Sequence, residues 1–187
     1  MNSMSRSYYD PCKKDNLKKE EEKCPTIIKC GCPSTVQLPL VDITVLGSAS
    51  VTLASLTVDT SCICDPVIKL NFTSAFTTIA TAVVGAVNIQ IFKQCKNQLA
   101  PVPVGPSWPV VSAIAAGALT GTLFTSFFVC DSDSCNDDCC TYTAVATVSG
   151  VATAAIGAVF NNSTLAAEIT CRSNECHKKC KKDHDKY

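Results

Sequence analysis

The sequence predicts an all-β fold, an antiparallel β-sandwich or jelly roll of about seven to nine strands with a flexible arm at each end. Two observations support this prediction. Apolar and polar residues alternate with a period of two over most of residues 36–171. The alternating segments are short, and turn residues or cysteine clusters separate them. We therefore divide the chain into an N-terminal connector arm at residues 1–35, a sandwich body at residues 36–171 and a C-terminal tail at residues 172–187.

The N-terminal arm is polar and carries Cys12, Cys24, Cys30 and Cys32. Its most helix-like segment, residues 18–23, is fully charged and buries no apolar surface by itself. We therefore expect the arm to be disordered unless it docks on a partner. A cysteine on such an arm can bond a distant group, including one on another subunit.

The first half of the body contains three expected strands. Two lie at residues 41–45 and 50–59, with a turn at Gly47-Ser48 between them. A connection over residues 62–66 leads to the third strand, at residues 68–73. The even-numbered residues of this strand are apolar and the odd-numbered ones are polar, so one face is expected to point to the core.

The second half of the body continues the same pattern. A strand is expected at residues 84–94, ending at Cys95, and a proline-rich loop at residues 100–109 holds the only tryptophan, Trp108. The remaining strands border the cysteine clusters and run from Leu119 to Val129, from Tyr142 to Val148 and from Leu165 to Cys171.

Charge is distributed unevenly along a chain whose formal net charge is +0. The arm has net +2, the body net −5 and the tail net +3. Opposite charges align partners, so the arms are expected to contact the acidic body of a neighbouring identical copy. Contact with nucleic acid or a membrane surface, and simple solvation of the tails, are the alternatives.

The outward faces of the expected strands are mostly Thr, Ser, Ala, Asn and Gln. A soluble monomer normally shows more charge than this. Wide neutral surfaces suit packing against identical copies. The alternative is a threonine-rich extracellular sandwich that stays monomeric.

Fourteen cysteines in 187 residues favour disulfides over free thiols. Residues 1–10 contain no apolar stretch of the kind found in secretory signals. We therefore expect an extracellular or spore-surface location that is reached without a signal peptide, for example by lysis of the producing cell. The disulfide or cross-link candidates are Cys12, Cys24, Cys30, Cys32, Cys62, Cys64, Cys95, Cys130, Cys135, Cys139, Cys140, Cys171, Cys176 and Cys180.

One cysteine spacing occurs twice. Cys130, Cys135 and Cys139 are separated by four and three residues, and so are the cysteines from Cys171 to Cys180. The first copy is rich in aspartate and the second in lysine and arginine, so the two should attract if their strands share one end of the sandwich. Disulfides within or between subunits would then form readily. A closed loop of about 40 residues would stabilise the fold by roughly 4 kcal/mol. The alternative is that the repeated spacing is coincidental.

Metal binding is the second interpretation of the cysteines. Zinc sites usually contain Cys-x2-Cys pairs, and the chain has none. The best local ligand set is Cys176, His177, Cys180 and His184 in the tail. We favour disulfides and predict no metal or other cofactor.

Enzymatic activity is not expected. Both histidines lie in the tail, so the body offers no Cys-His pair, and the chain has no phosphate-binding glycine loop. Aromatic residues are too few to form a nucleic-acid stacking platform. Three uncharged segments, at residues 70–92, 97–130 and 139–167, are long enough to span a membrane. Their Thr- and Ala-rich alternation favours strands, so we predict no membrane span.

Four motifs carry a resemblance to a known family: Val58–Val67, Phe92–Gln98, Pro103–Trp108 and Cys135–Thr143. In their order and spacing, over about residues 30–171, the chain resembles an uncharacterised cysteine-rich family of spore-forming clostridia. That family has no established activity. The resemblance therefore implies lineage and no chemistry.

The chain is also similar, more loosely, to the subunits of Bacillus endospore appendages. Those are small jelly rolls without a signal peptide, and a cysteine-bearing N-terminal connector bonds each subunit to its neighbours. The resemblance implies that residues 1–35 are the connector here. This chain departs from that pattern in having more cysteines and a basic C-terminal tail.

We hypothesise a structural, self-assembling subunit of a disulfide-cross-linked extracellular fibre, appendage or spore-surface layer. The partners would be identical subunits, with the N-terminal arm docking on neighbours. The alternatives are a cysteine-rich metal-binding surface protein and a monomeric, disulfide-stapled sandwich that binds a ligand or carbohydrate. In the last case Trp108 would be the natural contact residue, although a packing role suits a single tryptophan better.

Overall fold

A computed structural model of the chain describes most of the body. The described residues are 26–38, 47–60, 63, 65–80, 84–96, 98–111, 119–132, 139–151 and 157–172, and all structural statements below concern these residues. They form nine strands and no helix. The strands are β1 (Ile27–Cys30), β2 (Ser34–Gln37), β3 (Gly47–Asp59), β4 (Pro66–Ala80), β5 (Val84–Cys95), β6 (Val102–Val111), β7 (Leu119–Asp131), β8 (Cys139–Val151) and β9 (Gly157–Cys171).

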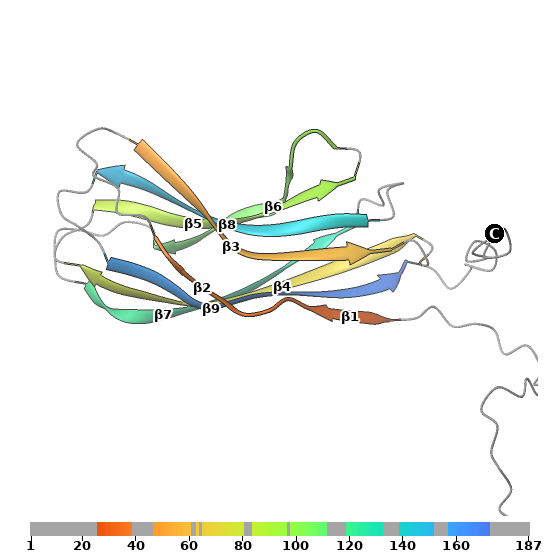
Figure 1. Cartoon of the computed structure of the whole chain (residues 1–187), viewed down its shortest axis with the longest axis horizontal. Helices are drawn as coiled ribbons and strands as arrows, with labels where there is room; N and C mark the ends of the chain where they lie inside the picture. Colours follow the sequence, from red (N-terminus) through yellow and green to blue (C-terminus); the bar gives the residue numbers. More distant parts are fainter. Residues whose placement is uncertain are drawn as a thin grey trace, which may run out of the picture.

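The strands form two antiparallel sheets, which Figure 1 shows stacked one on the other. Sheet A has the order β1-β9-β4-β7, and β2 also pairs with β9. Sheet B has the order β3-β8-β5-β6. This arrangement is a β-sandwich, so the predicted all-β fold class is confirmed.

The period-two pattern of the sequence positions the core between the sheets. In β4, Ile68, Leu70, Phe72, Ser74 and Phe76 are buried, and the odd-numbered residues between them lie on the outer face. On the core side of sheet A, the ring of Phe76 lies 4.7 Å from that of its cross-strand neighbour Phe160 on β9. The expected strands at residues 50–59, 68–73 and 84–94 are confirmed, whereas the expected strand at residues 41–45 lies outside the described residues.

The turn predicted at Gly47-Ser48 is wrong. Gly47 pairs with Gly150 and Ser48 with Ser149, so β3 begins at Gly47. Gly47 and Ser48 adopt a strand conformation in place of a turn because β8 extends far enough to provide ladder hydrogen bonds for both residues.

The proline-rich loop predicted at residues 100–109 is also wrong, because most of it is β6. Prolines are tolerated there because β6 is an edge strand of sheet B. The β5–β6 register shifts between Ile89 and Ile91, and the side-chain amide of Gln90 donates hydrogen bonds to the carbonyl oxygens of Val104 and Gly105 at 3.2 Å each.

Trp108 of β6 packs across to the other sheet. Its ring is stacked on the ring of Phe127 in β7, with 4.9 Å between centroids. The two edge strands β6 and β7 therefore meet through an aromatic contact. This geometry gives Trp108 a packing role.

The end of the predicted connector arm belongs to sheet A. The predicted boundary at residue 35 places β1 and part of β2 in the arm, but both strands pair with β9. Ile27 and Val36 pack against the core, and the backbone N–H of Gly31 donates to the carbonyl of Leu165 at 2.8 Å. Burial of these apolar residues accounts for the docking of this segment.

Gly105 provides a stability test. It has a φ of +69°, and a Cβ atom built there would overlap the Val129 side chain. We expect Gly105→Ala to lower the free energy of unfolding by about 1–3 kcal/mol, through backbone strain and overpacking. Chemical denaturation measures this. Gly121→Ala is the matched control, because nothing lies within 4 Å of its Cβ position. Equal stability of the two variants would contradict the assignment.

Candidate functional site at the cysteine end

One end of the sandwich gathers strand termini that carry cysteine and charge. The connections β3–β4 and β7–β8 place the ends of both sheets together there. We call this region the cysteine end and define it by the paired strand-end residues Asp59, Pro66, Cys95, Asp131, Cys139, Cys140 and Cys171. In sequence, Cys62, Cys64 and Cys135 fall in the connections that leave from this end, and those three lie outside the described residues.

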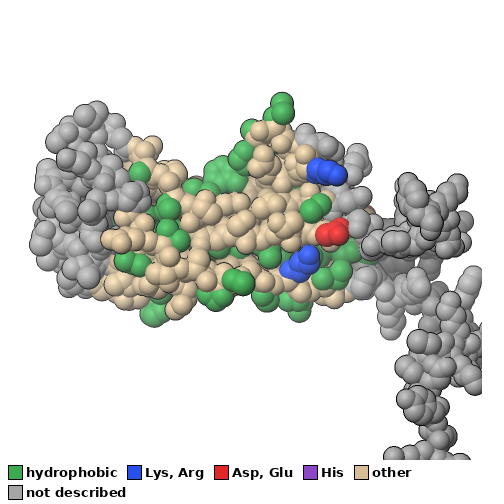
Figure 2. Space-filling model, in the orientation of Figure 1, with side chains coloured by type: hydrophobic (Ala, Val, Ile, Leu, Met, Phe, Trp, Pro, Cys, Tyr) green, Lys and Arg blue, Asp and Glu red, His purple; other side chains and the backbone are tan. Residues whose placement is uncertain are grey.

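Charged side chains are also concentrated at the cysteine end. Figure 2 shows Lys, Arg, Asp and Glu near the right-hand end of the body only, which is the cysteine end in this view. The remaining described surface in that view is neutral. The charged residues that the structure describes are Lys29, Asp59, Asp65, Lys69, Lys93, Lys96, Asp131, Glu168 and Arg172.

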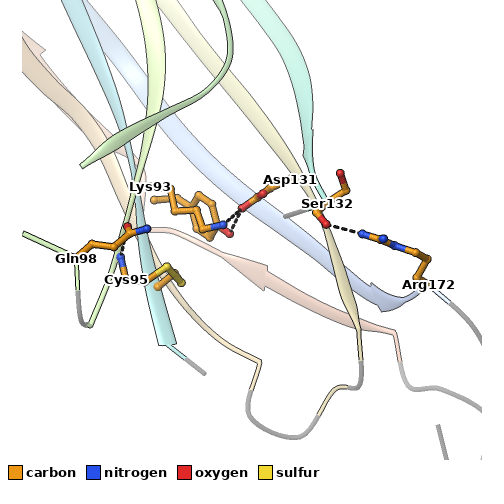
Figure 3. Close-up of polar contacts among 8 residues, drawn as sticks. Lys93, Cys95, Gln98, Asp131, Ser132 and Arg172 are labelled. Atoms are coloured by element: carbon orange, nitrogen blue, oxygen red, sulfur yellow. Dashed lines mark hydrogen bonds and ion pairs between the residues drawn. A yellow bond between two sulfur atoms is a disulfide. The ribbon is translucent and has the colours of Figure 1, made fainter. Parts of the chain in front are cut away.

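A disulfide joins Cys95 of β5 to Cys140 of β8. The two residues are direct cross-strand partners, with 4.0 Å between their Cα atoms, and both are buried. Gln98 closes the turn after β5: its side-chain oxygen accepts a hydrogen bond from the Cys95 N–H, and its own N–H donates to the Cys95 carbonyl (Figure 3). Cys171 at the end of β9 is also disulfide-bonded.

Four described cysteines are free and exposed: Cys30, Cys32, Cys130 and Cys139. Cys130 lies on the outer face of β7 opposite Lys69, and Cys139 begins β8 opposite Asp59. Cys30 lies further along sheet A, opposite Ala166 near the middle of β9. The sequence predicted all of these as disulfide or cross-link candidates. Their exposure leaves them accessible to a partner outside the chain.

A buried polar cluster joins the two sheets beside the disulfide. The Nζ atom of Lys93 on β5 lies 2.8 Å from Oδ2 of Asp131 on β7, and only 5% and 6% of the two side chains are exposed. The hydroxyl of Tyr142 on β8 donates to the same Oδ2 at 2.7 Å. Figure 3 shows Lys93 and Asp131 pointing toward each other. Two groups of sheet B thus contact one carboxylate of sheet A.

Sequence reasoning placed Asp131 in an acidic loop and did not single out Lys93. The alternation of residues along the strands nevertheless indicates that both side chains point to the core. Lys93 follows Ile89 and Ile91 at intervals of two, and Asp131 follows Phe127 and Val129 in the same way. Period-two spacing therefore places both charges on the core side.

Arg172 begins the basic segment after Cys171 and contacts two of the loops at this end, β3–β4 and β7–β8. Its backbone N–H donates to the Asp65 carbonyl at 3.0 Å, and its Nε lies 3.6 Å from the Asp65 carboxylate. Its guanidinium also donates to the Ser132 carbonyl. The strands that lead into the acidic and basic cysteine runs, β7 and β9, therefore end at the same end of sheet A, with β4 between them. Cys135, Cys176 and Cys180 of those runs lie outside the described residues.

The outer face of sheet A exposes large apolar side chains. Phe124 is 86% exposed, Phe128 60% and Ile28 72%. Lys69 lies 5.6 Å above the Phe128 ring and 3.7 Å from Glu168, so the charges on this face are paired. This face thus combines exposed apolar side chains with paired charges, and exposed apolar side chains are typical of interaction surfaces.

The described residues contain no group of three or more His, Cys, Asp or Glu side chains placed to hold a metal ion, and both histidines lie outside them. No helix among them is both long and apolar enough to cross a membrane.

A family model matches residues 24–170. The chain belongs to this family, which is described as a domain of unknown function (DUF4489). The match covers the sandwich body and excludes most of the N-terminal arm and the C-terminal tail. No curated protein matches the chain.

The chain has a low-level similarity to two solved structures of VP2 from infectious bursal disease virus. A mutant VP2 in derived T=1 particles is 12% identical, with a TM-score of 0.46 over 88% of this chain and 36% of that chain. The VP2 subviral particle is 14% identical, with a TM-score of 0.44 over 88% and 37% of the respective chains. The chain thus spans little more than a third of the proteins it matches. A likeness at this level carries no information about function.

The Cys95–Cys140 bond gives a second stability test. We expect the Cys95→Ala/Cys140→Ala double variant to lose about 2–4 kcal/mol of unfolding free energy, because its unfolded state is no longer constrained by the bond. Denaturant titration without reductant measures the loss. Cys130→Ala is the control, since this exposed free thiol should change stability by less than about 0.5 kcal/mol. A double variant as stable as the wild type would show that the bond does not stabilise the fold.

Proposed function

We propose that the chain is a structural subunit that assembles with identical copies into a disulfide-cross-linked extracellular fibre, appendage or spore-surface layer. In this role it needs no cofactor, nucleic acid or enzymatic activity. It would act at the cell or spore surface.

The observation that carries the proposal is the division of the cysteines into two classes. Cys95 and Cys140 are buried and bonded to each other, so neither is available to a neighbouring molecule. Cys30, Cys130 and Cys139 face outward as free thiols. Exposed thiols on an extracellular protein oxidise, and a thiol without a partner in its own chain must find one on another molecule.

The neutral surface supports packing of identical copies. Hydroxyl groups on the outer faces bond to each other across neighbouring strands, as in Ser50 with Thr147 at 3.1 Å and Thr57 with Thr141 at 3.0 Å. Removing a hydroxyl that is hydrogen-bonded in this way from water costs less free energy than removing an unpaired one. Together with exposed Phe124 and Phe128, such faces can be covered without burying unpaired charge.

The position of the arms supports the same proposal. The chain enters β1 and leaves β9 at the cysteine end, because Ile27 pairs with Ile169 close to the end of β9. The segments beyond carry Cys12 and Cys24 on one side and Cys176 and Cys180 on the other. Cysteines on both arms are therefore attached next to the end that presents Cys130 and Cys139.

A non-reducing gel tests the proposal. We expect the purified, oxidised protein to form a ladder of covalent oligomers that reductant converts to monomer, and electron microscopy to show ordered assemblies. A variant with Cys30, Cys32, Cys130 and Cys139 all changed to Ser should form far fewer covalent oligomers, because the arm cysteines then lack these four exposed thiols on the neighbouring body. The Cys95→Ser/Cys140→Ser variant is the matched control and should keep the ladder.

Other outcomes would contradict the proposal. A wild-type chain that is monomeric with and without reductant rules out cross-linked assembly. Stoichiometric zinc, with free thiols after denaturation, would instead support a metal-binding surface protein. A ladder that persists in the four-serine variant would show that the body thiols are not the points of attachment.

A further inference from the structure

The pair formed by Lys93 and Asp131 is unusual because both side chains are almost wholly buried at 2.8 Å separation. Removing two charges from water is unfavourable by several kcal/mol for each ion, and mutual attraction offsets this only in part. Transfer of one proton from the ammonium to the carboxylate turns the pair into a neutral amine and a neutral carboxylic acid.

We propose that Lys93 and Asp131 react after folding to form an intramolecular isopeptide bond, an amide between Nζ of Lys93 and the side-chain carboxyl carbon of Asp131. The inference stands on the geometry of this cluster and does not depend on the proposed assembly.

The reaction needs no oxidant, metal or cofactor. A proton passes from the ammonium to the carboxylate, and the neutral amine attacks the carboxyl carbon to give a tetrahedral intermediate. One carboxyl oxygen then leaves as water, with the proton of the acid and one proton from the nitrogen. The product is a neutral amide that retains one N–H, so atoms and charge balance.

The residues around the pair promote this step in two ways. The fold holds amine and carboxyl in contact, which replaces a bimolecular encounter by an intramolecular one with a high effective concentration. The Tyr142 hydroxyl donates to Oδ2 at 2.7 Å and can stabilise the negative charge that develops on that oxygen. Tyr142 is itself fully buried, so its hydrogen bond acts in a low-dielectric site.

The bond would complement the neighbouring disulfide. Cys95–Cys140 links two strands of the same sheet, whereas an amide between Lys93 and Asp131 would link β5 in sheet B to β7 in sheet A. The sheets would then be tied together at the cysteine end by a bond that reductant does not break. It would also replace two buried charges by one neutral group.

Mass spectrometry of the fully reduced, alkylated and denatured wild-type protein tests the proposal directly. We expect an intact mass lower than the sequence mass by one molecule of water. Trypsin should fail to cleave after Lys93 and should yield peptide 70–96 joined to peptide 97–172, because the acylated lysine is no longer a cleavage site. The full sequence mass, with cleavage after Lys93 and peptides 70–93 and 97–172 separate, would show an ion pair only and would overturn the proposal.

Two variants localise the chemistry. Lys93→Arg keeps the positive charge beside Asp131 but removes the nucleophilic amine, so it should have its full sequence mass whether or not it folds. Tyr142→Phe keeps the ring and removes the hydroxyl, so shortly after expression a larger fraction of it than of the wild type should remain unreacted. A deficit of one water in Lys93→Arg would assign the bond to another pair. Complete reaction of Tyr142→Phe would remove the role given to Tyr142.

Discussion

The contact between Lys93 and Asp131 determines how the two sheets meet at the cysteine end. Each charge is tolerated inside the sandwich only because the other lies opposite it, so β5 and β7 must keep the register that brings them together. Tyr142 adds β8 to the same constraint. Because residues in a strand alternate between faces, the inward position of these three side chains fixes which face their neighbours occupy.

The same alternation sorts the cysteines into two classes. Cys95 stands two residues after Lys93, and Cys140 two residues before Tyr142, so both point inward and meet as a disulfide. Cys130 and Cys139 stand one residue from an inward position, so both are exposed thiols. A shift of one residue in β8 would expose Cys140 and bury Cys139. The alternation of side chains along each strand thus accounts both for the buried disulfide and for the exposed thiols.

Much of the fold is predictable from the sequence, because period-two spacing in segments such as residues 68–73 has few other structural solutions. The failures have local causes. Residues 100–109 looked like a loop because prolines break central strands, but an edge strand tolerates them. The pairing of Cys95 with Cys140 could not be predicted, since 45 residues separate them and only the sheet order makes β5 and β8 neighbours. The inward parity of Lys93 was visible in the sequence, but its partner on the opposite sheet was not.

The concentration of charge at one end has a consequence for how copies can pack. Burying a charge between two molecules is unfavourable unless it is paired, so the neutral sides of the sandwich are the surfaces that identical copies can cover most readily. The cysteine end, with its charges and thiols, is better suited to directional contacts, where Arg172 already links Asp65 to Ser132 within one chain. Under the proposed assembly, force between neighbours enters each body at this end. A covalent tie between the sheets at Lys93 and Asp131 would resist their separation at the point where the load is applied.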